Sequence, residues 1–313
     1  MMKKGKVLFI DTAHTELALR LEKQGFECDY FEGFQREDFL RIAKEYSGII
    51  IRSKIKLDQE FLRECTNLKF IGRVGAGMEN IDKEFAEKNG ISCLNAPEGN
   101  RDAVAEQAIG MLLALFNKLI TSDNEVRRRI WIREGNRGYE IGGKTIGIIG
   151  YGNTGMAMAK KLSGFDANVI AYDKYKKDYS DEFVTESDMQ TLFEKCDIVS
   201  LHIPLTKETE FLVNTDFIKS FKKDVYIINT SRGKVLKTHD LVEMLDSGKV
   251  RGACLDVLEY EGLSFETIDL PEEFDSLITK KNVVLSPHIA GWTHESNFKM
   301  ATTITDKVAK LGL

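Results

Sequence analysis

The chain has 313 residues, of which 49 are acidic and 44 are basic, and its formal net charge of -5 favours neither nucleic acid nor an anionic membrane as a partner. The longest apolar stretch, residues 108–116, is shorter than the roughly 20 residues that cross a bilayer, and no secretory signal follows the basic start, so cytoplasmic residence is the default. The five cysteines are scattered without a Cys-x-x-Cys pair, which argues against a metal cluster or a redox dithiol.

The first part of the chain alternates apolar runs with segments of helical spacing, and its length also suggests two domains. The apolar runs are residues 7–10, 48–51 and 69–72, and the helical segments include 16–24 and 58–63. This alternation predicts a parallel sheet covered by helices on both faces. A helix over about 101–119 follows, and with the pair Gly142-Gly143 it is expected to link the domains.

A second alternating series occupies the rest of the chain. Its predicted strands are residues 145–149, 168–172, 197–201, 225–229, 251–255 and 283–285. The last segment, 295–313, has helical spacing of apolar residues, and we expect it to return and pack on the first half. The predicted fold class is therefore α/β, with two Rossmann-like, doubly wound parallel-sheet domains.

A glycine-rich turn follows the first strand of the second series, with the sequence Gly150-Tyr151-Gly152-Asn153-Thr154-Gly155. Gly150 permits a tight turn, Gly152 lets the backbone approach a pyrophosphate, and Gly155 lets the following helix pack closely. The phosphates would then lie over residues 152–155, at the helix N-terminus. Asp173, 18 positions beyond Gly155, ends the next strand, where a carboxylate binds ribose hydroxyls and repels a 2′-phosphate. The pattern predicts an NAD site; the alternative is an ordinary glycine turn.

Three polar residues follow later strands of the same series: Arg232, Glu261 and His288. Carboxyl ends of strands are where open α/β sheets bind ligands. A guanidinium at Arg232 could orient the carboxylate of a 2-keto or 2-hydroxy acid. An imidazole at His288 could act as the acid/base beside a hydride transfer, and Glu261 could hold that ring and stabilise its protonated form.

Each of these assignments has a structural alternative. Arg232 could form a surface ion pair, Glu261 could be a solvated residue of an acidic loop, and His288 could be a satisfied structural histidine. Most other histidines suit a structural or exposed role, although His202, at a strand end, could line the adenine side of a cleft. No zinc-type histidine spacing is present, so no metal is expected.

The ordered motifs resemble those of the D-2-hydroxyacid dehydrogenase family along nearly the whole chain. The motifs are residues 150–155, 201–206, 229–233, 255–257 and 286–291. The resemblance implies that Arg232, Glu261 and His288 form the catalytic set. It also implies that the cofactor is NAD and that Asp256 holds the nicotinamide carboxamide. Further residues expected beside the cofactor are Asn153, Thr154, His202, Pro204, Thr230 and His288.

The same resemblance implies a discontinuous substrate domain, flavodoxin-like, of residues 1–98 and 292–313, around an NAD-binding Rossmann domain of residues 99–291. It implies a homodimer built largely from the NAD-binding domain. In the first half, the segment Arg73-Val74-Gly75-Ala76-Gly77 matches the family loop whose backbone N–H groups receive the substrate carboxylate. Such a glycine-flanked loop can form an anion nest.

Within the family, the similarity is closest to the D-3-phosphoglycerate dehydrogenases, which act in serine biosynthesis. Arg52-Ser53 and Arg73 match substrate-domain segments of that group, and both arginines could contact a phosphate; ordinary surface solvation is the alternative. Two departures stand against the narrow assignment: the stretch 262–275 is acidic and lacks a proline after Glu261, and the chain stops at Leu313 without a regulatory domain. Another D-2-hydroxy acid (glycerate, glyoxylate or lactate) or an NAD-sensing binding protein therefore stays open.

Overall fold

The computed structural model describes residues 4–262 and 270–313, so residues 263–269 of the acidic stretch after Glu261 lie outside the described residues. Two compact units are present, one of residues 4–100 and 292–313, the other of residues 101–261 and 270–291. The first boundary lies at Asn100, and the Gly142-Gly143 pair lies inside the second unit, so the prediction that these glycines link the domains is wrong. Gly143, at φ +73°, instead makes a tight turn into a strand, with its N–H on the carbonyl of Asp166.

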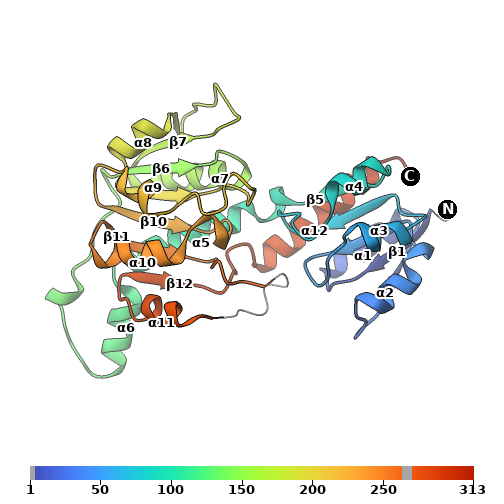
Figure 1. Ribbon diagram of the computed structural model, residues 1–313, viewed down its shortest axis with the longest axis horizontal. Coiled ribbons are helices and arrows are strands. Elements are labelled where there is room, and N and C mark those ends of the chain that lie inside the picture. Colours follow the sequence, from blue (N-terminus) through green and yellow to red (C-terminus); the bar gives the residue numbers. More distant parts are fainter. Residues whose placement is uncertain (1–3, 263–269) are drawn as a thin grey trace. The chain divides into compact units, whose positions relative to one another are not determined.

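The first unit is built on a five-stranded, fully parallel sheet (Figure 1). The strands are β1 (Gly5–Phe9), β2 (Phe26–Tyr30), β3 (Gly48–Ile51), β4 (Phe70–Arg73) and β5 (Ser92–Asn95). Their order, β2-β1-β3-β4-β5, is that of flavodoxin-like folds, and the winding reverses between β1 and β3. The three strands predicted from apolar runs are confirmed as β1, β3 and β4, which occupy the centre of the sheet.

Helices cover both faces of this sheet because alternate strand residues point to opposite sides. Val7 and Phe9 share a core with α1 and α12, whereas Leu8 shares one with α2 and α3. The helices are α1 (Thr15–Lys23), α2 (Arg36–Ile42), α3 (Gln59–Glu64), α4 (Lys83–Lys88), α12 (His294–Ala309) and the short η1 (Ala43–Glu45). The buried residues Met300 and Ile304 of α12 confirm that the last helix returns to the first half of the chain.

The second unit holds a seven-stranded parallel sheet. Its strands are β6 (Thr145–Ile149), β7 (Asn168–Tyr172), β8 (Thr185–Glu186), β9 (Ile198–Leu201), β10 (Val225–Asn229), β11 (Val250–Leu255) and β12 (Val283–Leu285). The order is β12-β11-β10-β9-β6-β7-β8, so the winding reverses between β6 and β9. The predicted α/β class with two doubly wound parallel sheets is confirmed.

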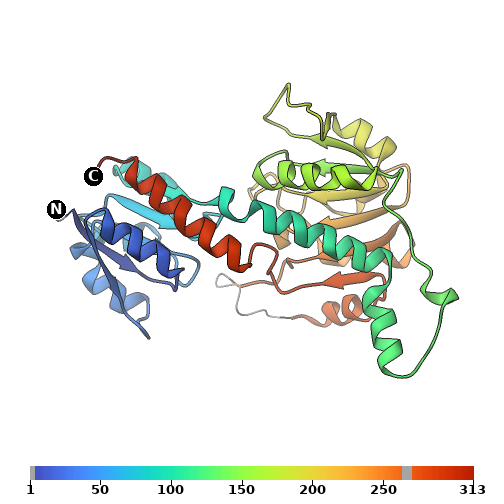
Figure 2. The same cartoon turned by 180° about the vertical axis from the view of Figure 1, so that it is seen from behind.

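Helices cover both faces of this sheet. α5 and α7 pack on the face seen in front in Figure 2, against Ile146, Ile148 and Ile228. α8, α9 and α10 pack on the opposite face, against Val199 and Ile227. The bounds are α5 (Pro97–Phe116), α6 (Leu119–Arg127), η2 (Glu134–Asn136), α7 (Asn153–Leu162), η3 (Ser163–Phe165), α8 (Met189–Lys195), α9 (Thr215–Lys219), η4 (Gly233–Val235), α10 (Thr238–Asp246) and α11 (Glu272–Ile278).

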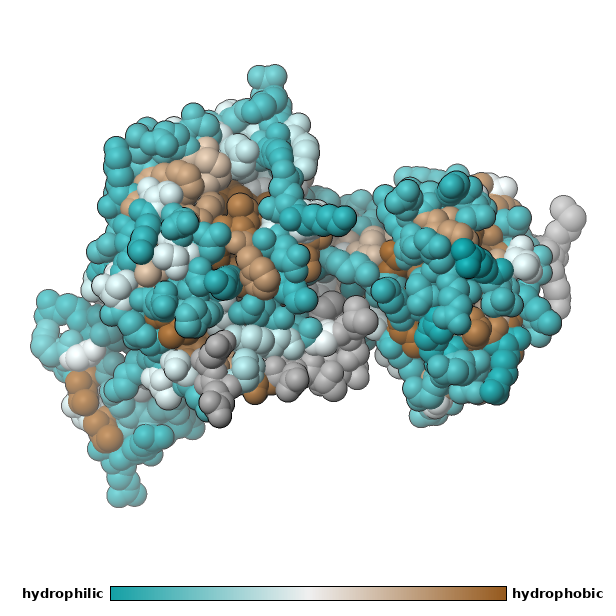
Figure 3. Space-filling model, in the orientation of Figure 1, coloured by the Kyte–Doolittle hydropathy of each residue, from teal (hydrophilic) through white to brown (hydrophobic). Residues whose placement is uncertain are grey.

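The segment from α6 to the next loop extends away from the second sheet and exposes apolar side chains (Figures 1 and 3). Trp131 is 80% exposed. The other exposed apolar residues are Leu119, Ile120, Val126, Ile130, Ile132 and Tyr139. Among the described residues no single helix meets the length and hydropathy needed to span a membrane; α5 and α6, bent by 58°, do so only as a pair and only by length and composition.

Close packing of α7 on β6 fixes the glycine-rich turn. A Cβ at Gly155 would lie 2.2 Å from the carbonyl oxygen of Gly150, which is closer than real Cβ contacts. Because the obstacle is backbone, the helix would have to move for any larger residue. The third glycine of the pattern is therefore a packing requirement.

Gly155→Ala should lower the free energy of unfolding by about 1–3 kcal/mol through overpacking, although alanine is the better helix former. Urea denaturation followed by circular dichroism measures this change. Gly164→Ala is the matched control, since a Cβ there meets nothing within 4 Å; it should stay within about 0.5 kcal/mol of wild type. Equal effects at the two positions would contradict the packing argument.

Candidate active site

The turn between β6 and α7 presents unpaired backbone donors. Asn153, Thr154 and Gly155 are the first three residues of α7, and no side chain caps the helix at Gly152. The N–H groups of a first helical turn have no carbonyl within the helix, and the helix dipole adds partial positive charge there. A Cβ at Gly152 would meet nothing within 4 Å, so the space in front of these donors is open to a phosphate.

Asp173 follows β7 and is held beside this turn by three backbone N–H groups. Its Oδ2 accepts from Tyr151 at 2.8 Å, and its Oδ1 accepts from Tyr175 and Lys176 at 2.9 and 3.0 Å. Burial would raise the pKa of Asp173, but these hydrogen bonds and the charge of Lys176 bring the net pKa below its usual value. The carboxylate is therefore ionised at neutral pH, as ribose binding and rejection of a 2′-phosphate require.

Three further predicted cofactor residues lie at the ends of β9 and β10. Thr230 follows β10, and its buried Oγ1 has no hydrogen-bond partner within the described part of the chain. Pro204 lies beyond β9, where its carbonyl accepts from Thr209 Oγ1 at 2.6 Å. An orphaned hydroxyl and open helix N–H groups at one edge of the sheet fit a dinucleotide with its own acceptors.

His202, at the end of β9, is buried and bonds to its own chain. Its Nε2 lies 2.8 Å from Ser200 Oγ, and the side chain belongs to a residue that is 8% exposed. Burial lowers the pKa of His202 to about 4, so the ring is neutral at pH 7. In this structure His202 is a buried histidine whose ring is hydrogen-bonded to Ser200. Its place beside adenine remains a prediction.

Arg232 is presented by a turn that Asn229 organises. Asn229 Oδ1 accepts from Ser231 N and Oγ, and its Nδ2 donates to the carbonyl of Arg232 at 3.0 Å. Nη1 of Arg232 donates to the carbonyl of Ser231 at 2.7 Å. A Cβ at Gly233 would lie 1.9 Å from the carbonyl oxygen of Leu258, so this glycine lets the Arg232 turn contact the loop after β11.

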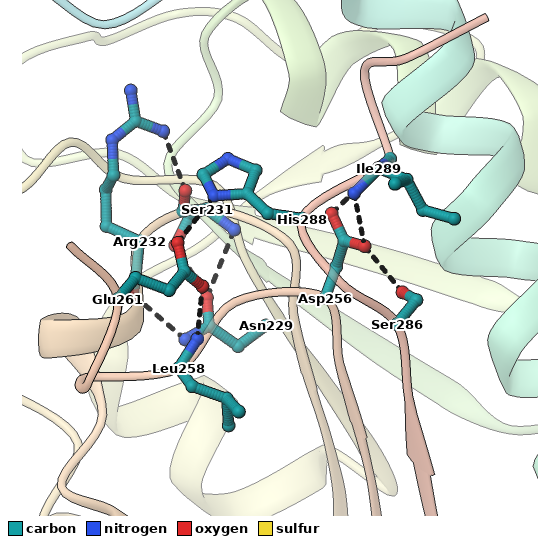
Figure 4. Close-up of polar contacts among 10 residues, drawn as sticks. Asn229, Ser231, Arg232, Asp256, Leu258, Glu261, Ser286, His288 and Ile289 are labelled. Carbon is teal, nitrogen blue, oxygen red and sulfur yellow. Dashed lines mark hydrogen bonds and ion pairs between the residues drawn. The ribbon is translucent and has the colours of Figure 1, made fainter. Parts of the chain in front are cut away.

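Glu261 and His288 form a direct pair between the loops after β11 and β12 (Figure 4). Glu261 Oε2 lies 2.6 Å from His288 Nδ1, and Oε1 accepts from Leu258 N at 2.6 Å. The two side chains are only 15% and 22% exposed. This contact excludes the reading of Glu261 as a solvated loop residue, and it places a carboxylate where it can hold the imidazole.

Asp256 fixes the loop that carries His288. Its carboxylate accepts from Ser286 Oγ at 2.5 Å and Ile289 N at 2.9 Å (Figure 4), and also from Ala290 N at 2.8 Å. The Asp256 carbonyl accepts from His288 N at 2.7 Å. His288 thereby adopts φ +54°, a left-handed conformation that costs energy for a non-glycine residue. Burial raises the pKa of Asp256, and the hydrogen bonds oppose that shift. Sequence reasoning missed Ser286 as a partner of Asp256, although it lies within the quoted 286–291 motif.

The predicted substrate residues of the first unit lie at the ends of β3 and β4. Within the described residues, no protein acceptor contacts the N–H groups of Ala76 and Gly77, next to Gly75 and Arg73, which suits an anion nest. Arg52 and Ser53 follow β3, and their N–H groups donate to Asp11 Oδ2 at 2.6 and 3.0 Å. Asp11 was not predicted from the sequence.

His202 gives the protein a defined acid sensitivity. Its pKa is about 4 in the fold and 6.5 in the unfolded chain, so between these values the unfolded state binds the proton more tightly. Stability from this group is present above pH 6.5 and is lost as the pH falls, by about 3 kcal/mol in total. When the pH is lowered from 7 to 4.5, the free energy of unfolding should therefore fall by about 2–3 kcal/mol less in His202→Gln than in wild type. Urea denaturation at the two pH values measures this difference.

The exposed His239 provides the control for this experiment. His239→Gln should keep the wild-type pH dependence, because more than half of the His239 side chain is exposed and the substitution changes no buried group. Parallel pH profiles for wild type and His202→Gln would exclude the buried neutral histidine as the cause.

Comparison with known proteins identifies the family of this architecture. Residues 109–290 match the family model described as D-isomer specific 2-hydroxyacid dehydrogenase, NAD binding domain. A D-3-phosphoglycerate dehydrogenase of Archaeoglobus fulgidus is 34% identical over 308 residues, which cover 98% of this chain and 57% of the relative. The chain thus spans little more than half the length of that relative.

Two other relatives match along nearly their whole length. A hydroxypyruvate reductase of Thermotoga maritima is 33% identical over 96% of this chain and 95% of its own. The crystal structure of D-lactate dehydrogenase with NAD+ from Lactobacillus jensenii superposes with a TM-score of 0.80, at 28% identity, over 98% of this chain and 97% of that one. The chain therefore belongs to the D-isomer specific 2-hydroxyacid dehydrogenase family.

Proposed function

We propose that the protein transfers hydride between NAD and a D-2-hydroxy acid or the corresponding 2-keto acid. The observation that carries the proposal is the contact of 2.6 Å between Glu261 and His288, at strand ends of the sheet that also holds the glycine-rich turn. An imidazole with one nitrogen fixed by a carboxylate is suited to exchange a proton at the other. Family membership supports the same chemistry.

The residues divide the work as follows. Arg232 binds the carboxylate and carbonyl region of the substrate through its planar donors. Since Nδ1 of His288 is hydrogen-bonded to Glu261, the proton exchanged with the substrate hydroxyl is carried on Nε2. Glu261 stabilises the imidazolium that forms when the hydroxy acid is oxidised. Bound NAD supplies the hydride acceptor or donor.

The cofactor is held by groups of the second unit. The N–H groups of Asn153, Thr154 and Gly155 bind the pyrophosphate, and Asp173 binds the adenosine ribose. The unsatisfied hydroxyl of Thr230 supports cofactor binding at the end of β10. Asp256 would hold the nicotinamide carboxamide, and its hydrogen bonds to Ile289 and Ala290 support this role by fixing the loop that carries His288.

The substrate we favour is D-3-phosphoglycerate with its keto acid, 3-phosphohydroxypyruvate. The 34% identity to the Archaeoglobus dehydrogenase supports it, and Arg52 and Arg73 provide cations suited to a phosphoryl group. The N–H groups of Ala76 and Gly77 would receive the substrate carboxylate. Hydroxypyruvate is the second candidate, supported by the full-length match to the Thermotoga reductase.

Oxidation of NADH tests the proposal, using 3-phosphohydroxypyruvate, hydroxypyruvate, glyoxylate and pyruvate as acceptors. His288→Ala should lower kcat by about 100-fold or more because the proton donor is lost. The Kd for NADH should change by less than about twofold, since His288 does not hold the phosphates or the ribose.

His294→Ala, at the next histidine in the chain, is the control and should keep wild-type kcat. Wild-type kcat in His288→Ala would refute the acid/base role. Tight NADH binding without turnover on any acceptor would instead favour an NAD-sensing protein.

We infer in addition that a second copy of the chain covers the exposed apolar segment from α6 to Tyr139. Trp131 is 80% exposed, and a hollow of about 380 Å³ lies on the same segment. Its lining combines apolar side chains, among them Phe116, Ile132 and Tyr139, with the charged Lys118, Glu125 and Arg251. A projecting side chain and a hollow on one surface suit an isologous dimer, in which the side chain of each copy enters the hollow of the other. Contiguous exposed apolar side chains of this kind mark interaction sites.

Trp131→Glu should convert a dimer into a monomer at micromolar concentration, because a charge would have to enter the apolar contact. Light scattering coupled to size-exclusion chromatography measures the mass. Leu19→Glu, at a half-exposed residue of α1, is the control and should stay dimeric. A monomeric wild type, or a dimeric Trp131→Glu, would reject this interface.

A further inference from the structure

The turn after β3 is built around an internal carboxylate. Asp11 Oδ2 accepts the N–H groups of Arg52, Ser53 and Lys54 at 2.6, 3.0 and 3.2 Å. β1 and β3 are neighbours, and the winding of the sheet reverses between them. Open α/β sheets bind ligands at such a point. The N–H groups of residues 52–54 already have Asp11 as their acceptor, so a ligand beside this turn would be recognised by side chains.

Arg52 is fixed on the carbonyl side as well. Asn80, which is 5% exposed, donates from Nδ2 to the carbonyls of Arg52 and Ile55, both at 3.3 Å. The N–H and the C=O of one residue are thus both held by buried or partly buried side chains from other segments. The direction in which the Arg52 side chain leaves the backbone is therefore set by the fold.

Trp292 fixes the other end of the side chain. The guanidinium carbon of Arg52 lies 3.9 Å from the centroid of a Trp292 ring. Trp292 comes directly before Thr293, whose capping box with Ser296 anchors the start of α12. This distance is within the range of a cation–π contact, and a guanidinium held by an indole offers a fixed set of planar donors that suits the paired oxygens of an anion.

We propose that Trp292, with Asp11 and Asn80, positions Arg52 as the receptor for a phosphoryl group at the far end of the substrate. The inference rests on the proposed function and extends it, because it assigns the choice between phosphorylated and unphosphorylated keto acids to Trp292. Trp292 is a positioning residue: it acts on the substrate through Arg52. Loss of the indole leaves the cation in place but frees its side chain, so the cost falls on binding of the phosphoryl group.

Steady-state kinetics with 3-phosphohydroxypyruvate and hydroxypyruvate tests this role, since the two acceptors differ only in the phosphoryl group. Trp292→Leu should raise the KM for the phosphorylated acceptor by about 5- to 20-fold, the range expected for a cation–π contact. Its kcat, and its KM for hydroxypyruvate, should stay within about twofold of wild type. Trp292→Phe keeps an aromatic face and should recover most of the lost affinity.

Phe298→Leu is the matched control, because Phe298 is an exposed aromatic residue of α12 that packs on His14. It should leave both KM values unchanged. Equal changes for the two acceptors in Trp292→Leu, or no change in either, would overturn the inference while the proposed function stands. A wild type that reduces hydroxypyruvate but not its phosphorylated form would overturn the phosphoryl receptor and the proposed substrate together, with the dehydrogenase activity retained.

Discussion

The buried carboxylate of Asp256 is the constraint on which the candidate active site depends. Asp256 is 1% exposed, and an unpaired carboxylate at such a site would cost several kcal/mol. Three donors from residues 286–290 form hydrogen bonds to the carboxylate. The loop after β12 is therefore held in place, because its movement would leave the buried charge without partners. The same bonds sustain the left-handed backbone of His288 and direct its Nδ1 to Glu261. Stability and catalysis are linked at this residue.

The topology of the second sheet explains why three distant residues of the sequence share one region. Arg232, Glu261 and His288 follow β10, β11 and β12, which are consecutive neighbours in the parallel sheet. The carboxyl ends of parallel neighbours emerge at the same edge. The close approach of Gly233 to Leu258 then joins the Arg232 turn to the loop of Glu261, and Glu261 joins that loop to His288.

Much of the fold could be predicted because buried parallel strands are continuous apolar runs, as at Gly48–Ile51 and Val225–Asn229. The edge strand β2 was missed, since its sequence Phe26–Tyr30 carries charge and buries only one residue. The glycine turn and the Glu261–His288 pair could be anticipated because strand order places motif residues together. The roles of Asp11, Asn80 and Trp292 could not, because their contacts join segments far apart in the chain and leave no periodic signal.

The two sheets use the same architecture in opposite ways at the point where their winding reverses. Within the described residues, the first N–H groups of α7, after β6, are left without acceptors, and the Thr230 hydroxyl, after β10, is buried without a partner. That edge is prepared for an external phosphate. Between β1 and β3, the N–H groups of residues 52–54 are taken by the chain's own Asp11. Recognition of an anion beside this turn therefore falls to a side chain such as Arg52, which is held at its N–H, its C=O and its guanidinium, whereas the N–H groups of Ala76 and Gly77 after β4 stay available as a backbone nest.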